Sequence, residues 1–254
     1  MTPPFRTAAA LTGTPHGFFG RQGGVSVGEL ASLNTGIGSG DDAHAIAENR
    51  RRAGEAVLPG AALVGVYQVH GRDCAIVEAP WDEAQRPHAD ALATDRPGIL
   101  LGILTADCVP VLLADADARV VGAAHAGWKG ALAGITDSTV EAMARLGANT
   151  ARISAAIGPC IGAASYEVDA AFVDRFLAAD PANDRHFRAG RAGHAMFDIA
   201  AYVAARLSAA GVMRVEILGD DTYALADDYF SYRRACHAQE NGFGRQLSVI
   251  GLPA

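Results

Sequence analysis

The sequence has no long hydrophobic run. No stretch approaches the roughly 18 consecutive apolar residues of a membrane-spanning helix, and no charged leader precedes an apolar segment at the N-terminus. An excess of positive charge is also lacking: the formal net charge is -7, which argues against a general surface for nucleic acid or anionic membranes. We therefore expect a cytoplasmic protein that binds neither nucleic acid nor membranes.

Cysteine and histidine are too few and too scattered for several classes of site. The four cysteines (Cys74, Cys108, Cys160 and Cys236) form no CxxC pair, which predicts free thiols and neither a disulfide framework nor a zinc finger. The eight histidines form no HxH pair, whereas a multicopper oxidase needs many histidine ligands for a type 1 copper site and a trinuclear cluster. Laccase chemistry is therefore not expected.

Apolar residues and glycine, by contrast, are plentiful. Hydrophobic residues make up 50% of the 254 residues and glycine contributes 29, enough for a large core and many tight turns. No low-complexity linker, charged run or repeat divides the chain. We therefore predict an α/β fold in which residues 1–254 form a single domain of mixed β-sheets with outer helices.

Apolar runs bounded by turn residues predict the elements of this domain. The expected strands cover residues 14–20, 63–69, 74–77, 98–105, 119–124, 152–157, 215–219 and 247–251. The expected helices cover residues 42–57, 131–146, 169–178 and 198–210.

Three residues whose side chains can bind a metal ion or react as nucleophiles follow predicted strands: His70, Cys108 and His125. Each alone is compatible with ordinary packing, but three at strand ends favour a joint site. Two imidazoles and one thiolate with an open fourth position are typical of catalytic zinc, which lowers the pKa of a bound water to about 7. If the strand continues through Asp107, its side chain points to the opposite face of the sheet from that of Cys108. Asp107 is therefore expected to be a structural carboxylate.

The same three residues permit a second mechanism. Cys108 would be the nucleophile, and His125 or His70 would act as its general base. One sulfur cannot be both metal ligand and free nucleophile, so metal content distinguishes the two hypotheses.

Motifs along nearly the whole chain closely resemble the YfiH-type family, long labelled multicopper polyphenol oxidase or laccase-domain proteins. They are HGFFGRQGGVSVGELASLNTG (16–36), QVHG (68–71), TADCVPVLL (105–113), HAGWKG (125–130), IGPCIG (157–162), SYEV (165–168), FDIA (197–200) and YFSYRR (229–234). The resemblance implies stacked mixed sheets with helices outside, and a zinc site whose ligands match His70, Cys108 and His125, with copper less favoured. These three are also the expected catalytic residues.

The resemblance further implies activity on purine nucleosides. Adenosine, inosine, guanosine or methylthioadenosine would react with phosphate to give free base and sugar 1-phosphate, and adenosine would also be deaminated to inosine. Some members of the family are instead described as peptidoglycan editing factors, which keeps open a Cys108-dependent hydrolase or amidase acting on a cell-wall precursor. A non-catalytic metal-binding protein is the third alternative. We expect a monomer.

Phosphorolysis also needs groups that bind an anion and the nucleoside. The candidates are Arg21 and Asn34 in the glycine-rich early segment, Lys129 at a helix start, and Arg233. One departure from the family is Asp221-Thr222 where relatives often have Cys-Thr, so any role of that thiol is in doubt here.

Overall fold

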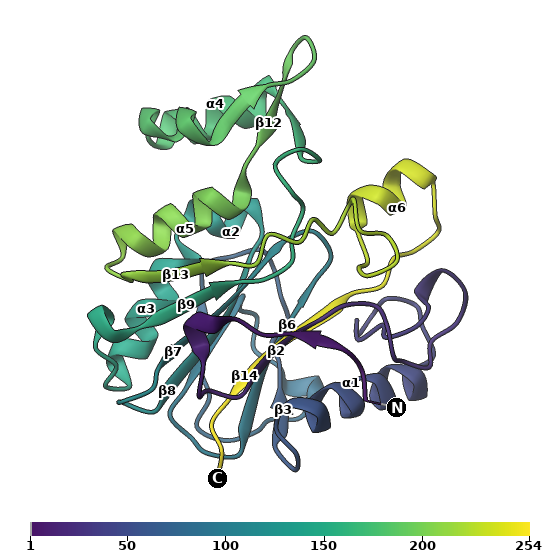
Figure 1. Ribbon diagram of the computed structural model, residues 1–254, viewed down its shortest axis with the longest axis vertical. Coiled ribbons are helices and arrows are strands. Elements are labelled where there is room, and N and C mark those ends of the chain that lie inside the picture. Colours follow the sequence, from purple (N-terminus) through teal and green to yellow (C-terminus); the bar gives the residue numbers. More distant parts are fainter. Residues whose placement is uncertain (1) are drawn as a thin grey trace.

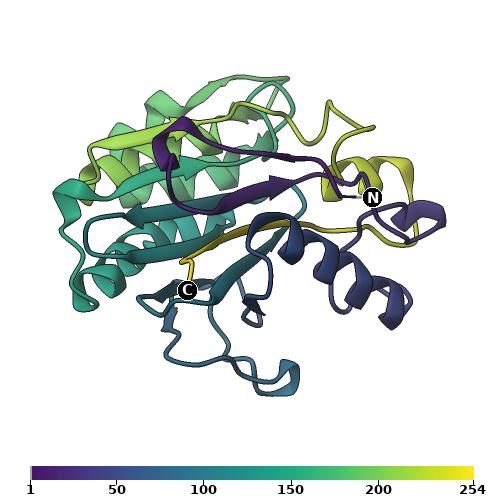
Figure 2. The same ribbon diagram turned by 60° about the horizontal axis from the view of Figure 1, so that its bottom comes forward.

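Two mixed β-sheets stack face to face, and helices cover both outer surfaces of the stack (Figures 1 and 2). The computed structural model describes residues 2–254. This arrangement confirms the predicted α/β fold of mixed sheets with outer helices.

The larger sheet has six strands and the facing sheet has five. In spatial order the first consists of β13 (Arg214–Ile217), β9 (Ser154–Ile157), β7 (Val109–Asp115), β8 (Val120–Ala126), β5 (Ala91–Thr94) and β4 (Cys74–Ile76). The second consists of β1 (Phe5–Arg6), β2 (His16–Phe19), β14 (Gln246–Gly251), β6 (Ile99–Thr105) and β3 (Ala62–Val64). A small third sheet contains β10 (Glu167–Asp169), β12 (His194–Phe197) and β11 (Phe187–Ala189).

The α-helices are α1 (Ala43–Val57), α2 (Trp128–Ala133), α3 (Ile135–Arg145), α4 (Ala170–Ala179), α5 (Ile199–Ala209) and α6 (Tyr232–Ala238). Short 3-10 helices cover Ala9–Leu11, Gly28–Leu30, Glu83–Gln85, Thr150–Arg152 and Pro181–His186. Aspartates cap three of the longer helices: the carboxylates of Asp42, Asp169 and Asp198 each accept a backbone N–H of the first turn of α1, α4 and α5.

Side-chain alternation explains the layers. In β6, Leu101 and Ile103 face the six-stranded sheet and pack with residues such as Leu112, whereas Leu100 faces the opposite way and packs with Ala53 of α1. The other face of the six-stranded sheet is covered by α2, α3 and α5. The central strands are therefore buried on both faces, as their continuous apolar sequences require.

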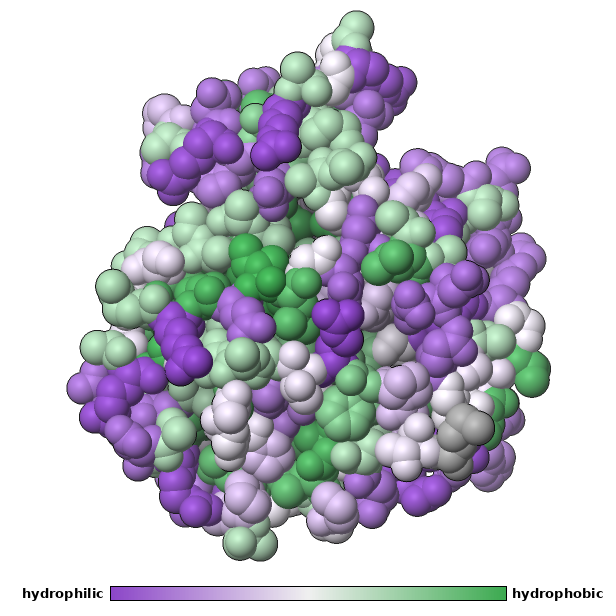
Figure 3. Space-filling model, in the orientation of Figure 1, coloured by the Kyte–Doolittle hydropathy of each residue, from purple (hydrophilic) through white to green (hydrophobic). Residues whose placement is uncertain are grey.

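The small sheet and α4 form a lobe that projects from the stack (Figure 1). Its interior is aromatic, and Phe172 lies 5.1 Å from Trp128 of α2, measured between ring centroids. Below the lobe, hydrophobic residues gather at the surface near β13, where Met213 is 80% exposed (Figure 3). No helix within residues 2–254 combines the length and apolar character needed to cross a membrane.

The predicted elements differ from the observed ones in several details, and β5, α6 and the strands of the third sheet were not predicted. The strand expected at residues 63–69 ends at Val64, because the chain leaves the sheet at Gly65. The helix expected at 131–146 is divided into α2 and α3 by Gly134, whose φ of 95° favours glycine. The apolar run of β7 was not recognised as a strand, although it is central in its sheet.

Candidate metal centre

Three segments that are distant in sequence bring His70, Cys108 and His125 together. His125 lies in β8, Cys108 in the turn between β6 and β7, and His70 in the segment that follows β3. Their potential ligand atoms lie within 4.8 Å of one another, and Cys108 Sγ is 3.9 Å from His70 Nε2. The structure thus unites the three residues that were predicted to share an ion.

Asp90 fixes the orientation of His125. The Nδ1–H of His125 donates to Asp90 Oδ1 over 2.7 Å, and both side chains are buried. Because Nδ1 is occupied, Nε2 is the nitrogen that His125 offers to Cys108 and to the cluster.

The same carboxylate holds the turn that carries His70. Asp90 accepts the backbone N–H groups of Val69, His70 and Gly71 at 3.1, 2.9 and 2.6 Å. His70 has a φ of 59°, a conformation that costs free energy for a residue other than glycine and that this ring of hydrogen bonds stabilises. Asp90 therefore positions two of the three potential ligands.

Asp107 acts in a similar way beside Cys108. Its φ is 82°, and its buried carboxylate accepts Thr222 Oγ1 at 2.7 Å, Ser231 Oγ at 3.0 Å and the backbone N–H of Arg233 at 2.7 Å. These bonds anchor the Cys108 turn to the C-terminal part of the chain. Asp107 therefore has the structural role that was expected, although it lies in a turn after β6 and not in a continued strand, as that expectation assumed.

The two imidazoles favour a thiolate at Cys108. Burial alone would raise the pKa of this thiol, but the charge and hydrogen bond of His125, followed by those of His70, lower the pKa to about 6. Burial would likewise lower the pKa of His125, yet Cys108 and Asp90 raise it to about 9. The thiolate that these imidazoles favour is the form of Cys108 that can bind a metal ion or act as a nucleophile.

The donor set fits a metal ion. Zinc bonds of about 2.3 Å to sulfur and 2.0–2.1 Å to nitrogen place tetrahedral ligands roughly 3.6 Å apart, close to the 3.9 Å between Cys108 and His70. Blue copper sites share the Cys-His-His set but add a long axial ligand, usually methionine. No methionine within residues 2–254 lines the adjoining cavities, and both amide atoms of Gln68 are bonded to Leu104, so the donors favour zinc.

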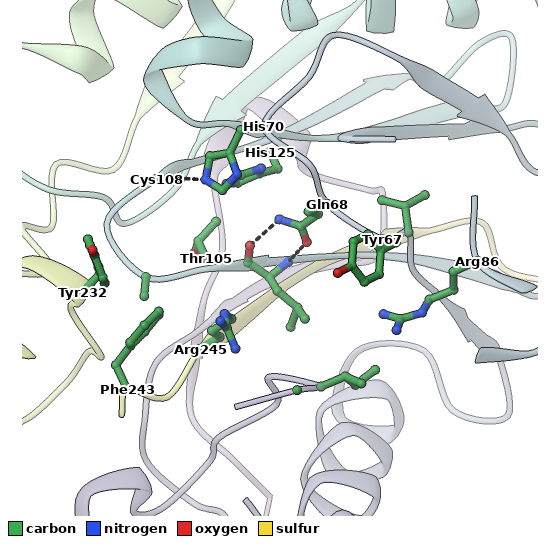
Figure 4. A pocket seen from close by; sticks show the side chains of 15 residues that line it. Tyr67, Gln68, His70, Arg86, Thr105, Cys108, His125, Tyr232, Phe243 and Arg245 are labelled. Carbon is green, nitrogen blue, oxygen red and sulfur yellow. Dashed lines mark hydrogen bonds between the residues drawn. The ribbon is translucent and has the colours of Figure 1, made fainter. Parts of the chain in front are cut away.

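Two cavities meet at this cluster and share His70, Ala106, Cys108 and Tyr232. The arginine cavity has a volume of about 550 Å³ and is further lined by Tyr67, Arg86, Thr105, Phe243 and Arg245 (Figure 4). The aromatic cavity has a volume of about 400 Å³ and is further lined by Trp128, Lys129, Ile161, Tyr166 and Arg233. Both volumes lie in the range of small-molecule sites.

The four predicted substrate-binding residues lie in different places. Lys129 and Arg233 line the aromatic cavity, where the Arg233 guanidinium donates to the Glu167 carbonyl and lies over the Tyr166 ring. Arg21 donates to the carbonyls of residues 29, 31 and 226 and lines neither cavity. Asn34 is fully buried and its Oδ1 accepts the backbone N–H of Arg245.

Asp221, the departure from the family pattern, lines neither cavity. Its Oδ2 accepts Ser165 Oγ at 2.6 Å and its Oδ1 accepts the Tyr223 N–H at 2.9 Å. Its contacts therefore brace the segment around Thr222, whose hydroxyl reaches Asp107.

Sequence reasoning missed Asp90, Thr105 and Arg245. Asp90 was not singled out, although a carboxylate directly before a buried strand is a usable signal. Thr105 begins the motif TADCVPVLL but was assigned no role, and nothing in the local sequence around Arg245 marks it. The pairing of β14 with β6 brings the two segments together.

The fold and the cluster define a layered α/β protein with a Cys-His-His centre between two cavities. A family model described as multi-copper polyphenol oxidoreductase laccase matches residues 15–253, and the chain belongs to this family. It is similar to the crystal structures of YlmD from Geobacillus stearothermophilus (TM-score 0.89, 32% identity, 99% of this chain and 100% of that one) and YfiH from Bacillus licheniformis (TM-score 0.83, 31% identity, 93% and 92%). The predicted family is confirmed.

Relatives with assigned names are similar over most of their length. A protein of Streptomyces griseus named purine nucleoside phosphorylase ORF3 is 42% identical over 229 residues, which cover 89% of this chain and 92% of the relative. A purine nucleoside phosphorylase of Deinococcus radiodurans is 41% identical over 242 residues, which cover 94% of this chain and 89% of the relative.

Proposed function

We propose that residues 1–254 form one catalytic domain that acts as a zinc-dependent purine nucleoside phosphorylase and also deaminates adenosine. The observation that carries the proposal is the meeting of His70, Cys108 and His125 at the junction of two cavities. The names of the relatives support the reaction class. Adenosine, inosine, guanosine and methylthioadenosine are the proposed nucleosides.

The proposed phosphorolysis needs two reactants to meet at one carbon atom. A phosphate oxygen forms a bond to C1′ of the ribose, the bond from C1′ to the purine nitrogen breaks, and the leaving base takes up a proton. Two compartments that meet at one cluster suit this reaction because each can hold one reactant in place. A bound zinc ion would supply Lewis-acid chemistry at neutral pH.

The protein's own residues supply orientation. Asp90 keeps the proton on His125 Nδ1 and holds the His70 turn, so both imidazoles are fixed before substrate binds. Trp128 and Tyr166 line the aromatic cavity, and their rings give it an apolar wall that suits a purine. In the proposed deamination, water replaces the amino group at C6 of adenosine and ammonia is released.

Incubation of the purified protein with adenosine, with and without phosphate, tests this proposal. We expect adenine only with phosphate and inosine in both reactions, as separated by chromatography. Cys108→Ala should abolish both products and the bound zinc, whereas Cys236→Ala, which removes an exposed thiol outside both cavities, should preserve them. Absence of adenine and inosine with zinc-loaded wild-type protein would contradict the proposal.

A Cys108-dependent hydrolase or amidase is the second candidate. The lowered pKa of the Cys108 thiol favours it, because a thiolate beside an imidazole is an activated nucleophile. This candidate predicts a metal-free enzyme that hydrolyses a cell-wall precursor and is inactivated by alkylation at Cys108. Stoichiometric zinc in the active protein would exclude it.

Polyphenol oxidation is not supported by the side chains. Within residues 2–254, His70, Cys108 and His125 form the one group of three or more potential metal ligands. A multicopper centre needs a type 1 site and a separate trinuclear cluster, for which no further histidines are gathered.

A further inference from the structure

We propose that Arg245 and Thr105 form a phosphate-binding subsite in the arginine cavity, so that the aromatic cavity is left for the purine. This inference rests on the proposed function and assigns one compartment to each reactant. The ligand chemistry is a phosphate dianion, supplied either by inorganic phosphate or by the 5′-phosphate of a nucleotide.

Arg245 is a cation whose charge is not matched by a neighbouring acid. Its Nη1 is buried and has no hydrogen-bond partner within residues 2–254. Burial lowers the pKa of Arg245, and no carboxylate charge offsets this effect. A buried guanidinium nitrogen without an acceptor is costly, so Arg245 would gain a partner by turning its guanidinium from Gly36 toward an anion in the cavity that it lines.

Thr105 lines the same cavity and carries a second unpaired polar group. Its side chain is only 2% exposed, and its Oγ1 has no hydrogen-bond partner among the described residues. In Figure 4, Thr105 is drawn between the two imidazoles and Arg245. Thr105 and Arg245 both line the cavity beside the cluster, and a hydroxyl and a guanidinium are the kinds of donor that bind phosphate.

Two other polar side chains of the arginine cavity already have partners. Arg86 is paired with the Glu83 carboxylate, and its Nε also donates to the Glu83 carbonyl. Gln68 donates to and accepts from the backbone of Leu104. Within residues 2–254 no aspartate or glutamate lines this cavity, so no acid opposes an anion beside Arg245.

The backbone of Arg245 is held in place before any ligand arrives. Its N–H donates to Asn34 Oδ1 at 3.0 Å, and its carbonyl accepts both the N–H and the hydroxyl of Thr35. Gly36 lets the arginine approach, because a Cβ there would lie 3.1 Å from its Nη1. The glycine-rich early segment therefore serves to fix Arg245, and Asn34 is a positioning residue.

The aromatic cavity is the competing location, since Lys129 and Arg233 line it. Its cations lie on aromatic faces, with Lys129 Nζ 5.6 Å from the centroid of Trp128 and the Arg233 guanidinium carbon 5.3 Å from that of Tyr166. Asp107 is also among the residues that line it. Arg245 also lies over a ring, 4.8 Å from the centroid of Phe243, so the cavities differ in Asp107 and in the hydrogen bond from Arg233 to the Glu167 carbonyl. These two features suit a neutral heteroaromatic base better than a dianion.

The test measures binding of inorganic phosphate to zinc-loaded protein by calorimetry, without turnover. Arg245→Gln should weaken phosphate binding at least about tenfold, since a hydrogen bond to a charged group contributes roughly 1.5–3 kcal/mol. Arg96→Gln, which removes an arginine remote from both cavities, should leave it unchanged. Phosphate binding that survives Arg245→Gln but is lost in Lys129→Gln would overturn the inference.

Thr105→Val separates a ligand-binding role from a structural one. The substitution keeps the side-chain shape and removes a buried hydroxyl that has no partner, so the free energy of unfolding should stay constant or rise. Phosphate binding should nevertheless weaken several-fold. A variant that is less stable and binds phosphate normally would contradict the proposed role of Thr105.

Two further binding experiments identify the source of the phosphate and distinguish the proposed phosphate subsite from the proposed phosphorylase function. Competition of inorganic phosphate with adenosine indicates that both enter one compartment and overturns the assignment; simultaneous binding supports it. A nucleoside 5′-monophosphate that displaces inorganic phosphate identifies the ester as a ligand of the same subsite. If wild-type protein binds phosphate through Arg245 but releases no adenine, the phosphorylase function fails and the subsite stands.

Discussion

Asp90 illustrates how one residue organises the candidate metal centre. It accepts the Nδ1–H of His125 and three consecutive backbone N–H groups around His70, and these bonds outweigh burial and lower its pKa. The ligand types were predictable because cysteine and histidine are the usual donors for zinc. The role of Asp90 was not, because its four partners come from two other segments of the chain.

Replacement of Asp90 by asparagine should weaken zinc binding about 10–100-fold. The amide cannot accept all four hydrogen bonds with a negative charge, so His125 and the His70 turn lose their fixed orientation. Competition with a fluorescent chelator measures the affinity. Asp95→Asn, at an exposed surface pair with Arg96, is the matched control, and equal affinities of the two variants would contradict this role.

Alkylation of Cys108 in zinc-depleted protein should follow a pKa near 6. The thiolate is the reactive form, so the rate constant should rise with pH through about 6 and level off above about 7. Iodoacetamide labelling in a Cys236→Ala background, followed by mass spectrometry, measures the rate. A midpoint above pH 8 would show that the imidazoles do not stabilise the thiolate.

The turn from β8 into α2 depends on the absence of a side chain. A Cβ at Gly127 would lie 2.7 Å from His70 Cδ2 and 3.1 Å from Cys108 Sγ, so two potential ligands pack directly against this glycine. The motif HAGWKG could be noticed in the sequence, but this close approach requires the tertiary arrangement. Strand β7 was missed for a different reason: both of its faces are covered, so its sequence does not alternate between apolar and polar residues.

Gly127→Ala should therefore displace His70 and Cys108 and lower zinc occupancy at least tenfold while the protein remains folded. Its backbone φ of -67° is accessible to alanine, so the effect is one of space. Gly54→Ala in α1 is the control: its Cβ would meet only Leu100 Cδ2, at 3.8 Å, and it should raise stability by about 0.5–1 kcal/mol. Metal analysis and thermal unfolding of both variants test the prediction.

Across the whole molecule, buried carboxylates form directional hydrogen bonds between segments, which hydrophobic contacts alone do not provide. Asp115 at the end of β7 accepts the N–H groups of Ala118 and Asn149 and pairs with Arg152. Although burial opposes it, these bonds lower the pKa of Asp115. The layered packing of sheets and helices was predictable from apolar periodicity, whereas these hydrogen bonds and ion pairs between distant segments were not.

Asp115→Asn should reduce the free energy of unfolding by about 1–3 kcal/mol at pH 7. The native pKa lies below the unfolded value of about 3.9, so the stabilisation is present above that value and is lost as the pH falls through the native pKa. Urea unfolding of wild type and variant at pH 7 and near pH 3 should therefore show a difference that shrinks in acid. A constant difference would indicate that the charge of Asp115 is not involved.

The order of the five-stranded sheet also affects biosynthesis. Strand β14 lies between β2 and β6, and Arg245 immediately precedes it. A nascent polypeptide must therefore leave a gap in this sheet until residues 245–251 have emerged from the ribosome, and the arginine cavity stays open on one side until then. Translation products that stop before β14 should expose the edges of β2 and β6 and be substrates for chaperones and proteases.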